Sequence, residues 1–324
     1  MMKTPTLFQG YDLIGDVHGC ADALETLLSR LGYKAGDKGY TYQDPACPRQ
    51  AIFLGDLIDR GNHIRRTLAL VKAMCDNGSA QVIMGNHEFN ALAYHTPVAY
   101  GFLRQRNARS EKQIKATLDE FAGHEQEWQM YLGWFQHLPF FLEFENFRVV
   151  HACWDQLLIE EYWRRYGTAA LTDEVLCESE DNSSFAARFI ERATRGISLR
   201  LPDGLLIRGR DGFHRHSFRV HFWGEQRQTY NDVVFQPDPL PQQLRQQALS
   251  AEEKARMLHY SADEKPLFIG HYWLRGQPQL VSRNIACLDY SAVNNGKLVA
   301  YRMEADARQL DAANFVFVDL ENHE

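Results

Sequence analysis

Five short apolar runs constrain the fold of this 324-residue chain more than any other feature. Each run has the length and the β-branched or aromatic content of a β-strand, and glycine or a polar residue follows it at once. The runs occupy residues 11–14, 51–54, 81–84, 147–150 and 267–269. Helical patterns at 21–31 and 64–74 separate the first three runs, so the sequence predicts an α/β layered fold. In such folds ligands gather at the carboxyl ends of the strands.

Each of these runs leads into a residue that can bind a metal ion. The candidate ligands are Asp16 and His18 after the first run, Asp56 after the second, Asn86 after the third, His151 after the fourth and His271 after the fifth. Oxygen and imidazole donors without thiolate suit Mn, Fe, Zn or Ni. We expect Asp16, His18 and Asp56 to hold one divalent ion. The second oxygen of Asp56 is expected to bridge to another ion, held also by Asn86, His151 and His271.

The neighbours of these ligands suggest hydrolysis of a phosphate ester. Two ions can generate hydroxide from a bridging water near neutral pH and clamp the attacked phosphoryl group for in-line displacement. Arg60 carries the planar fork that matches phosphate oxygens. His87 is expected to protonate the leaving oxygen, with Asp59 orienting its ring.

The interval 155–265 lies between the fourth and fifth runs and contains no flexible linker rich in glycine and serine. We therefore expect residues 1–324 to form a single domain, in which this interval is an elaboration that forms part of the substrate wall. Four histidines within it are alternatives to His271 as a ligand, although none follows so clear a strand: His214, His216, His221 and His259.

Composition excludes several other classes of protein. The net charge of −7 disfavours nucleic acid as the main partner, and Arg104, Arg106, Arg109, Lys112 and Lys115 are interpreted as a solvated helix face. Six scattered cysteines without a C-x-x-C pair argue against a disulfide framework. No apolar stretch approaches the roughly 18 residues of a membrane span. Because the start also lacks a secretory signal, we expect a cytoplasmic protein with no membrane partner.

Three motifs make the chain resemble a known family. They are G-D-V-H-G at 15–19, G-D-L-I-D-R-G at 55–61 and G-N-H-E at 85–88, followed by W-x-x-x-L-P and V-H-A within 134–152. The chain resembles the calcineurin-like metallophosphoesterases of the phosphoprotein phosphatase type, in the bacterial branch that includes serine/threonine phosphatases and diadenosine tetraphosphatases. The resemblance covers roughly the first half and the last sixth of the chain. Two motifs depart from the family pattern, because Cys153 stands in H-A-C and Tyr272 in G-H-Y-W.

The resemblance implies a central β-sandwich of two mixed sheets flanked by helices, with two divalent ions, manganese first and Fe, Zn or Ni as alternatives. It implies the ligand and catalytic roles given above, and a second phosphate-binding arginine, for which Arg210 is the candidate and Arg208 the alternative. The leading expectation is a phosphatase acting on phosphate monoesters, either phosphoproteins or small phosphoesters. The alternatives are a pyrophosphohydrolase of dinucleoside polyphosphates and a non-enzymatic binding module.

Overall fold

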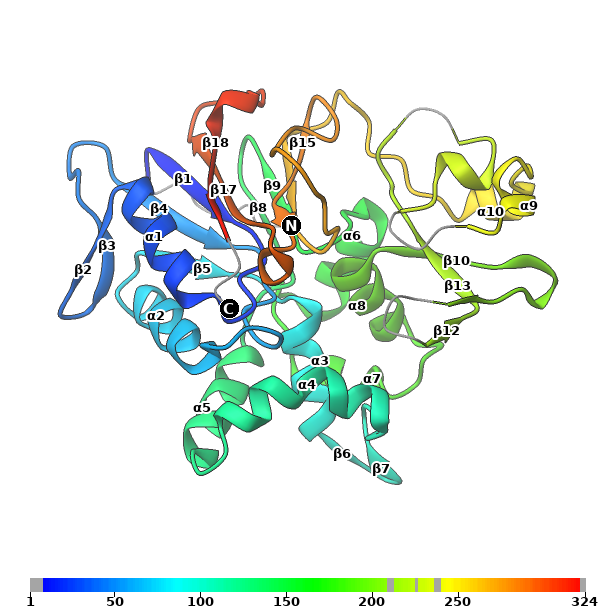
Figure 1. Cartoon of the computed structure of the whole chain (residues 1–324), viewed down its shortest axis with the longest axis horizontal. Helices are drawn as coiled ribbons and strands as arrows, with labels where there is room; N and C mark the ends of the chain where they lie inside the picture. The colour runs from blue at the N-terminus through cyan, green and yellow to red at the C-terminus, as the bar shows by residue number, and fades with distance from the viewer. Residues whose placement is uncertain (1–7, 209–212, 225–226, 236–239, 321–324) are drawn as a thin grey trace.

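Two mixed β-sheets form the centre of the protein in a computed structural model that describes residues 8–208, 213–224, 227–235 and 240–320 (Figure 1). The larger sheet has the order β16 (Asp289–Tyr290), β17 (Lys297–Glu304), β1 (Gly10–Ile14), β4 (Arg49–Phe53) and β5 (Ala80–Val82), and β18 (Phe315–Asp319) also pairs with β17. Strands β1, β4 and β5 are parallel, whereas β17 is antiparallel to its three neighbours.

The smaller sheet has the order β15 (Ile285–Cys287), β14 (Leu267–Ile269), β9 (Arg148–Val150) and β8 (Phe141–Glu143). Strands β15, β14 and β9 are parallel, and β8 is antiparallel to β9. All five apolar runs of the sequence form strands of these two sheets, namely β1, β4, β5, β9 and β14.

An apolar core joins the two sheets. Tyr11 and Leu13 of β1 belong to one buried cluster with Val149 of β9 and Phe268 of β14. Alternate residues of a strand face opposite sides, so one set of side chains fills this interior. Each sheet contains both parallel and antiparallel pairs, and the expected α/β sandwich of two mixed sheets is confirmed.

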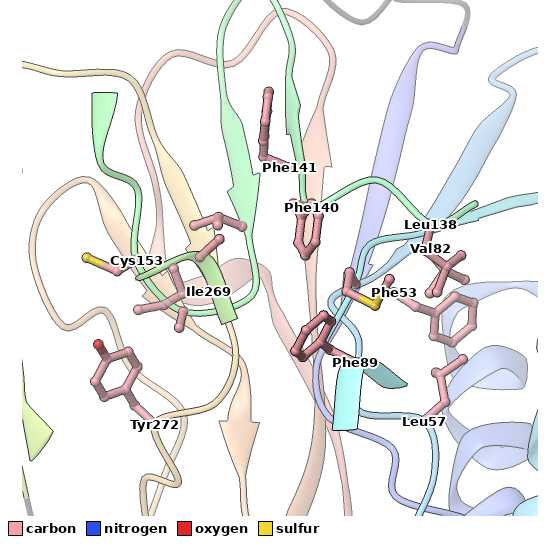
Figure 2. Packing of buried hydrophobic residues seen from close by; sticks show 14 of the residues in the cluster. Phe53, Leu57, Val82, Phe89, Leu138, Phe140, Phe141, Cys153, Ile269 and Tyr272 are labelled. Atoms are coloured by element: carbon pink, nitrogen blue, oxygen red, sulfur yellow. The ribbon is translucent and has the colours of Figure 1, made fainter. Parts of the chain in front are cut away.

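Helices cover the outer faces of the sandwich. The first two are α1 (Ala21–Leu31) and α2 (Ile64–Asp76), close to the two predicted helices. Helix α1 buries leucines at 24, 27, 28 and 31, one face of an amphipathic helix, and Gly32 ends it in the left-handed conformation. A second apolar cluster packs the helices onto the sheets, and Figure 2 shows part of it.

The region 90–146 combines helices with a short hairpin. It contains the end of α3 (Asn86–His95), then α4 (Ala108–Glu120) and α5 (Glu125–Phe135), but a hairpin of β6 (Pro97–Val98) and β7 (Gly101–Phe102) interrupts them. Pro97 disfavours helical geometry at Thr96, which is extended, so α3 ends there. A second unpredicted hairpin pairs β2 (Tyr33–Gly36) with β3 (Gly39–Tyr42).

The interval 155–265 lies mainly to one side of the two sheets, at the right of Figure 1. Its helices are α6 (Gln156–Tyr166), α7 (Asp173–Glu178), α8 (Phe185–Arg195), α9 (Gln242–Arg245) and α10 (Ala251–Ala255). Its strand pairs are β10 (Ile197–Arg200) with β13 (Ser217–Val220), and β11 (Ile207–Arg208) with β12 (His214–Arg215). Within the described residues no helix is both long and apolar enough to cross a membrane.

Candidate metal centre

The candidate ligands follow the carboxyl ends of strands in both sheets. Asp16 and His18 follow β1, Asp56 follows β4, Asn86 opens α3 after β5, His151 follows β9 and His271 follows β14. All six side chains are buried. Parallel strands of one sheet end at the same edge, and the packing of the two sheets brings these edges together, so that Asp16 meets the backbone of His271, 255 positions away.

Asp56 lies at the centre of this group. Its Oδ2 is 3.7 Å from His18 Nε2, and its Oδ1 is 3.4 Å from His151 Nε2. Two sets of potential metal ligands share this carboxylate, and the donor atoms of each set lie within 4.8 Å of one another. One set is Asp56 with His18 and His87, and the other is Asp56 with His151 and His271.

The candidate ligands Asp16 and Asn86 lie beside these two sets. The carboxylate oxygens of Asp16 are each 3.3 Å from the backbone nitrogen of His271, and Asn86 Oδ1 is 3.4 Å from His151 Nε2. The structure therefore brings together all six residues that the sequence singles out. The presence of His87 in the first set differs from the sequence expectation, which gives His87 a role in proton transfer.

The histidine rings present bare nitrogens to this cluster. His18 Nδ1 donates to the carbonyl oxygen of Ile58 at 2.8 Å, and His151 Nδ1 donates to that of Leu54 at 2.6 Å. A carbonyl can only accept, so a neutral ring keeps a lone pair on Nε2. The Nε2 atoms of His18 and His271 are buried without a hydrogen-bond partner. Burial lowers the pKa of both rings well below 6.5, so they are neutral, as metal ligands must be.

The carboxylates of the cluster also fit a cation. Burial, followed by the charge of nearby Asp289, raises the pKa of Asp16 well above its usual value. Asp289 is itself buried, and burial raises its pKa too. Crowded buried carboxylates are costly unless a positive charge compensates them. Together with the unpaired imidazole nitrogens, they show that these residues fit a divalent-metal site. Asp289 was not among the residues predicted from the sequence, because no glycine separates it from the apolar run 285–288.

The backbone is strained at the same positions. Seven described residues other than glycine have positive φ angles, and the first five are candidate site residues: His18, Asp56, Asp59, Arg60 and His271, with Ser291 and Asn295. Positive φ is unfavourable for residues with a Cβ atom and persists only where the surroundings enforce it. Such outliers cluster at functional sites because the strained turn aims a side chain at a ligand.

Two motif glycines leave room for the carboxylates. A Cβ atom on Gly85 would lie 2.4 Å from the backbone nitrogen and from Oδ1 of Asp56. A Cβ atom on Gly270 would lie 2.2 Å from Asp16 Oδ1. Any larger residue would therefore displace a candidate ligand, which explains why glycine stands beside ligands in these motifs.

Glu88, the last residue of the third motif, positions the Asp56 loop. Its carboxylate accepts hydrogen bonds from the backbone nitrogens of Asp56 at 2.8 Å, Leu57 at 2.7 Å and Gly85 at 3.1 Å. Burial, and then the charge of Asp56, raises the pKa of Glu88 to about 7. The sequence suggests no role in the site for Glu88, because two of its three partners, Asp56 and Leu57, are backbone groups of another loop.

The predicted catalytic group lies directly beside the ligands. His87 Nδ1 donates to Asp59 Oδ2 at 2.6 Å, and Arg60 Nη2 donates to His87 Nε2 at 3.2 Å. Thr117 of α4 holds Asp59 in position through two hydrogen bonds. Its hydroxyl donates to Asp59 Oδ1 and accepts from the Asp59 backbone nitrogen. Sequence reasoning missed Thr117, whose only signal is its place on a helix face that turns out to be buried.

Arg210, the sequence candidate for a second phosphate-binding arginine, lies outside the described residues, and Arg208 is exposed on β11. Two other arginines lie nearer to the candidate ligands. Arg219 Nη1 donates to the backbone oxygen of His271 at 3.4 Å. The charges of Arg219 and Arg195 add to burial in lowering the pKa of His271. Neither arginine follows a strand ending in a recognisable motif, so the sequence did not indicate them.

The alternative histidines of the interval 155–265 lie elsewhere. His221 Nδ1 bonds to the backbone oxygen of Trp223 at 2.7 Å, and His259 Nδ1 is 3.1 Å from Arg227 Nη2. His214 and His216 are exposed. Among the described residues, the ligand sets around Asp56 include His271 and none of these four.

His151 makes metal binding dependent on pH. Burial favours its neutral form, but the adjacent Asp56 outweighs burial and raises the pKa of His151 to about 10 in the metal-free protein. The ion pair of His151 with Asp56 makes its full contribution to the stability of the metal-free protein below about pH 6.5. That contribution is lost as the pH rises through about 10, where His151 loses its proton. A metal ion must displace the same proton.

We therefore expect displacement of the His151 proton to make metal affinity rise by up to about tenfold per pH unit below about pH 10, with about one proton released from His151 at pH 8. Calorimetric titration with Mn²⁺ in two buffers of different ionisation enthalpy measures this release. Binding at pH 8 without proton release would contradict the assignment of His151.

A family model described as calcineurin-like phosphoesterase matches residues 12–181, slightly more than half of the chain. The chain therefore belongs to the calcineurin-like phosphoesterase family, which confirms the resemblance seen in the sequence.

The relatives include several named for dinucleoside tetraphosphates. The chain is 31% identical over 174 residues to the asymmetrical bis(5'-nucleosyl)-tetraphosphatase PrpE of Oceanobacillus iheyensis, covering 52% of this chain and 65% of that protein. It is 30% identical over 140 residues to the symmetrical bis(5'-nucleosyl)-tetraphosphatase of Vibrio parahaemolyticus, covering 43% of each. The match thus spans from under half to about two thirds of these two relatives' lengths.

A solved structure supports the fold alone. A protein serine/threonine phosphatase from Saccharomyces cerevisiae, with similarity to human phosphatase PP5, superposes with a TM-score of 0.50 at 13% identity. The superposition covers 98% of this chain and 82% of that one.

Proposed function

We propose that this protein hydrolyses phosphoric esters at a site that holds two divalent ions sharing Asp56. One ion would be held with Asp16 and His18, and the other with Asn86, His151 and His271. The observation that carries the proposal is the position of Asp56 between two sets of ligands, each of which contains a buried histidine nitrogen without a hydrogen-bond partner. Divalent ions bound there would polarise phosphoryl oxygens and lower the pKa of water.

The surrounding residues would bind the phosphoryl group and protonate the leaving oxygen. Arg60 and Arg195 orient the phosphoryl group through their planar guanidinium groups, and Arg195 replaces Arg210 as our candidate for the second arginine. His87 would donate a proton from Nε2 to the leaving oxygen, which takes the place of Arg60 at that nitrogen, while Nδ1 stays bonded to Asp59. In-line attack by water would then break one P–O bond: the phosphorus gains the hydroxyl group, the leaving oxygen gains the proton from His87, and the second proton of the water leaves to solvent, which reprotonates His87.

We also retain the proposal of a single domain. The interval 155–265 supplies Arg195 and Arg219 near His271, which favours its role as part of the substrate wall. The complete set of ligands and the His87–Asp59 pair favour an enzyme over a non-enzymatic binding module.

Two substrate classes remain candidates. The sequence analysis put phosphate monoesters first and dinucleoside polyphosphates second. The names of the relatives, both symmetrical and asymmetrical bis(5'-nucleosyl)-tetraphosphatases, favour the second class. We therefore place dinucleoside polyphosphates first, with phosphate monoesters as the second candidate.

Metal analysis combined with two assays tests the proposal. Protein stripped with a chelator and reconstituted with Mn²⁺ is expected to retain two ions per chain after gel filtration. It is expected to hydrolyse diadenosine tetraphosphate with a higher kcat/KM than p-nitrophenyl phosphate. Retention of one ion or none, or hydrolysis of neither compound, would contradict the proposal, whereas hydrolysis of the aryl phosphate alone would restore the monoesterase.

A further inference from the structure

A small polar cavity of about 160 Å³ lies beside α3. It lies between α3, the segment after β7 and the helices α7 and α8, and its polar lining is Asn90, Arg104, Ser179, Asn182, Glu191 and Arg195. Pockets for whole drug-sized ligands measure about 300–1,000 Å³, so this cavity suits one chemical group of a larger molecule.

The cavity and the metal centre are built on the same helix. Helix α3 begins at the candidate ligand Asn86, and Asn90 lies about one turn further along. Arg195, at the end of α8, lines the cavity and acts on the pKa of His271. The negative charge of Asp59 acts on Arg104 and favours the charged form of its guanidinium group. A molecule with two linked groups could therefore place one at the metal centre and the other here.

Two guanidinium groups converge on one neutral atom in this cavity. Arg104 Nη1 donates to Asn90 Oδ1 at 2.7 Å, and Arg195 Nη2 donates to the same oxygen. Arg195 also pairs with Glu191 at 2.8 Å. Arg104 Nη2 also donates to the neutral Gln113 Oε1 at 2.7 Å, and no carboxylate of the described residues forms an ion pair with Arg104.

The positive charge of Arg104 is thus poorly compensated. Its side chain is half-buried, and burial, together with the charge of Arg195, lowers its pKa to about 10. A neutral amide oxygen satisfies hydrogen-bond donors but does not neutralise two neighbouring cations. An anion entering the cavity would gain from both guanidinium groups.

The structure also changes the interpretation of the basic run at 104–115. Arg106 lies with its guanidinium carbon 3.4 Å from the ring centroid of Phe102, and Lys115 pairs with Asp119 at 2.6 Å. Arg106 and Lys115 thus interact with residues close to them in the sequence, and Lys115 lies on a solvated helix face, as expected. Arg104 alone of the three lines the cavity.

We propose that this cavity binds a second phosphoryl group of a phosphoanhydride chain whose neighbouring group occupies the metal centre. Arg104 is then a specificity residue that favours polyphosphate esters over monoesters. The inference rests on the proposed function. It assigns to Arg104 and Asn90 a role that neither the motifs nor the ligand sets indicate.

Arg104→Gln tests the proposal, with Arg308→Gln as the matched control because Arg308 is exposed on the segment between β17 and β18. With Mn²⁺, kcat/KM is measured for diadenosine tetraphosphate and for p-nitrophenyl phosphate. We expect Arg104→Gln to lower the ratio of the first to the second by about tenfold or more, since charge-assisted bonds to phosphate are strong. The control is expected to leave the ratio unchanged.

A binding measurement separates the cavity from catalysis. Inorganic tripolyphosphate is titrated calorimetrically into the metal-free protein and its Arg104→Gln variant. We expect about tenfold weaker binding by the variant. Equal losses on both substrates, or unchanged tripolyphosphate affinity, would overturn the proposal by showing that Arg104 has only a structural role.

Asn90→Asp provides a second variant in case Arg104→Gln does not fold. It keeps the shape of the side chain but places a carboxylate between the two guanidinium groups, which should exclude an incoming anion. We expect the same fall in the substrate ratio and in tripolyphosphate affinity, and no fall in either would contradict the cavity assignment. A wild-type protein that hydrolyses neither substrate would instead refute the proposed function, and tripolyphosphate binding would still test the cavity.

Discussion

Asp56→Asn is expected to reduce kcat by about 10³-fold or more on any substrate, and to reduce the retained metal below two ions per chain. The amide keeps the size of the side chain but removes the charge that both ligand sets share. Only one oxygen then remains as a metal ligand, so it cannot bridge two ions as a carboxylate does. Elemental analysis after gel filtration and steady-state kinetics with Mn²⁺ measure the two effects.

The matched control is Asp37→Asn, on the exposed turn between β2 and β3. It is expected to keep both activity and metal content. Far-UV circular dichroism should show that the Asp56 variant is folded. A folded Asp56→Asn protein that retains two ions and full activity would refute the shared-ligand assignment.

His87→Asn is expected to lower kcat by about 10²–10⁴-fold for esters with poor leaving groups, because general acid catalysis contributes this much. Aryl esters with acidic leaving groups need less protonation, so their rates should fall less. The backbone nitrogen of His87, which donates to Asp56 Oδ1 at 2.9 Å, is untouched by the substitution. A series of phosphate esters with graded leaving-group pKa gives the slope of log kcat for both proteins.

Metal content distinguishes this role from that of a ligand, because His87 also lies within one ligand set. An acid role predicts two retained ions and a steeper dependence on leaving-group pKa in the variant. Equal slowing of all esters, or loss of an ion, would show that His87 is not the proton donor. His137→Asn, at an exposed position of the loop after α5, is the matched control.

Prediction from sequence succeeded where a residue with suitable side-chain chemistry directly follows a strand pattern in the sequence. The run before Asp56 is a strand, and Asp56 lies in a turn strained at positive φ. Prediction failed where a role depends on a distant partner. Thr117 supports Asp59 across 58 residues, and Arg104 meets Arg195 on Asn90 across about 90 residues of chain. A threonine or arginine on a helix or loop has many possible partners, and its own neighbours in sequence do not select one.

The amino-acid sequence by itself determined the α/β class and the candidate ligands, because strand-like runs and glycine-flanked acidic and histidine residues are local patterns with few physical solutions; the two-sheet sandwich was implied by the family resemblance. The tertiary structure alone decided which backbone amides Glu88 restrains and where the two arginines Arg104 and Arg195 converge. These relations depend on distances between segments that are remote in the chain. Packing of the sheets and helices sets those distances, and no local pattern encodes them.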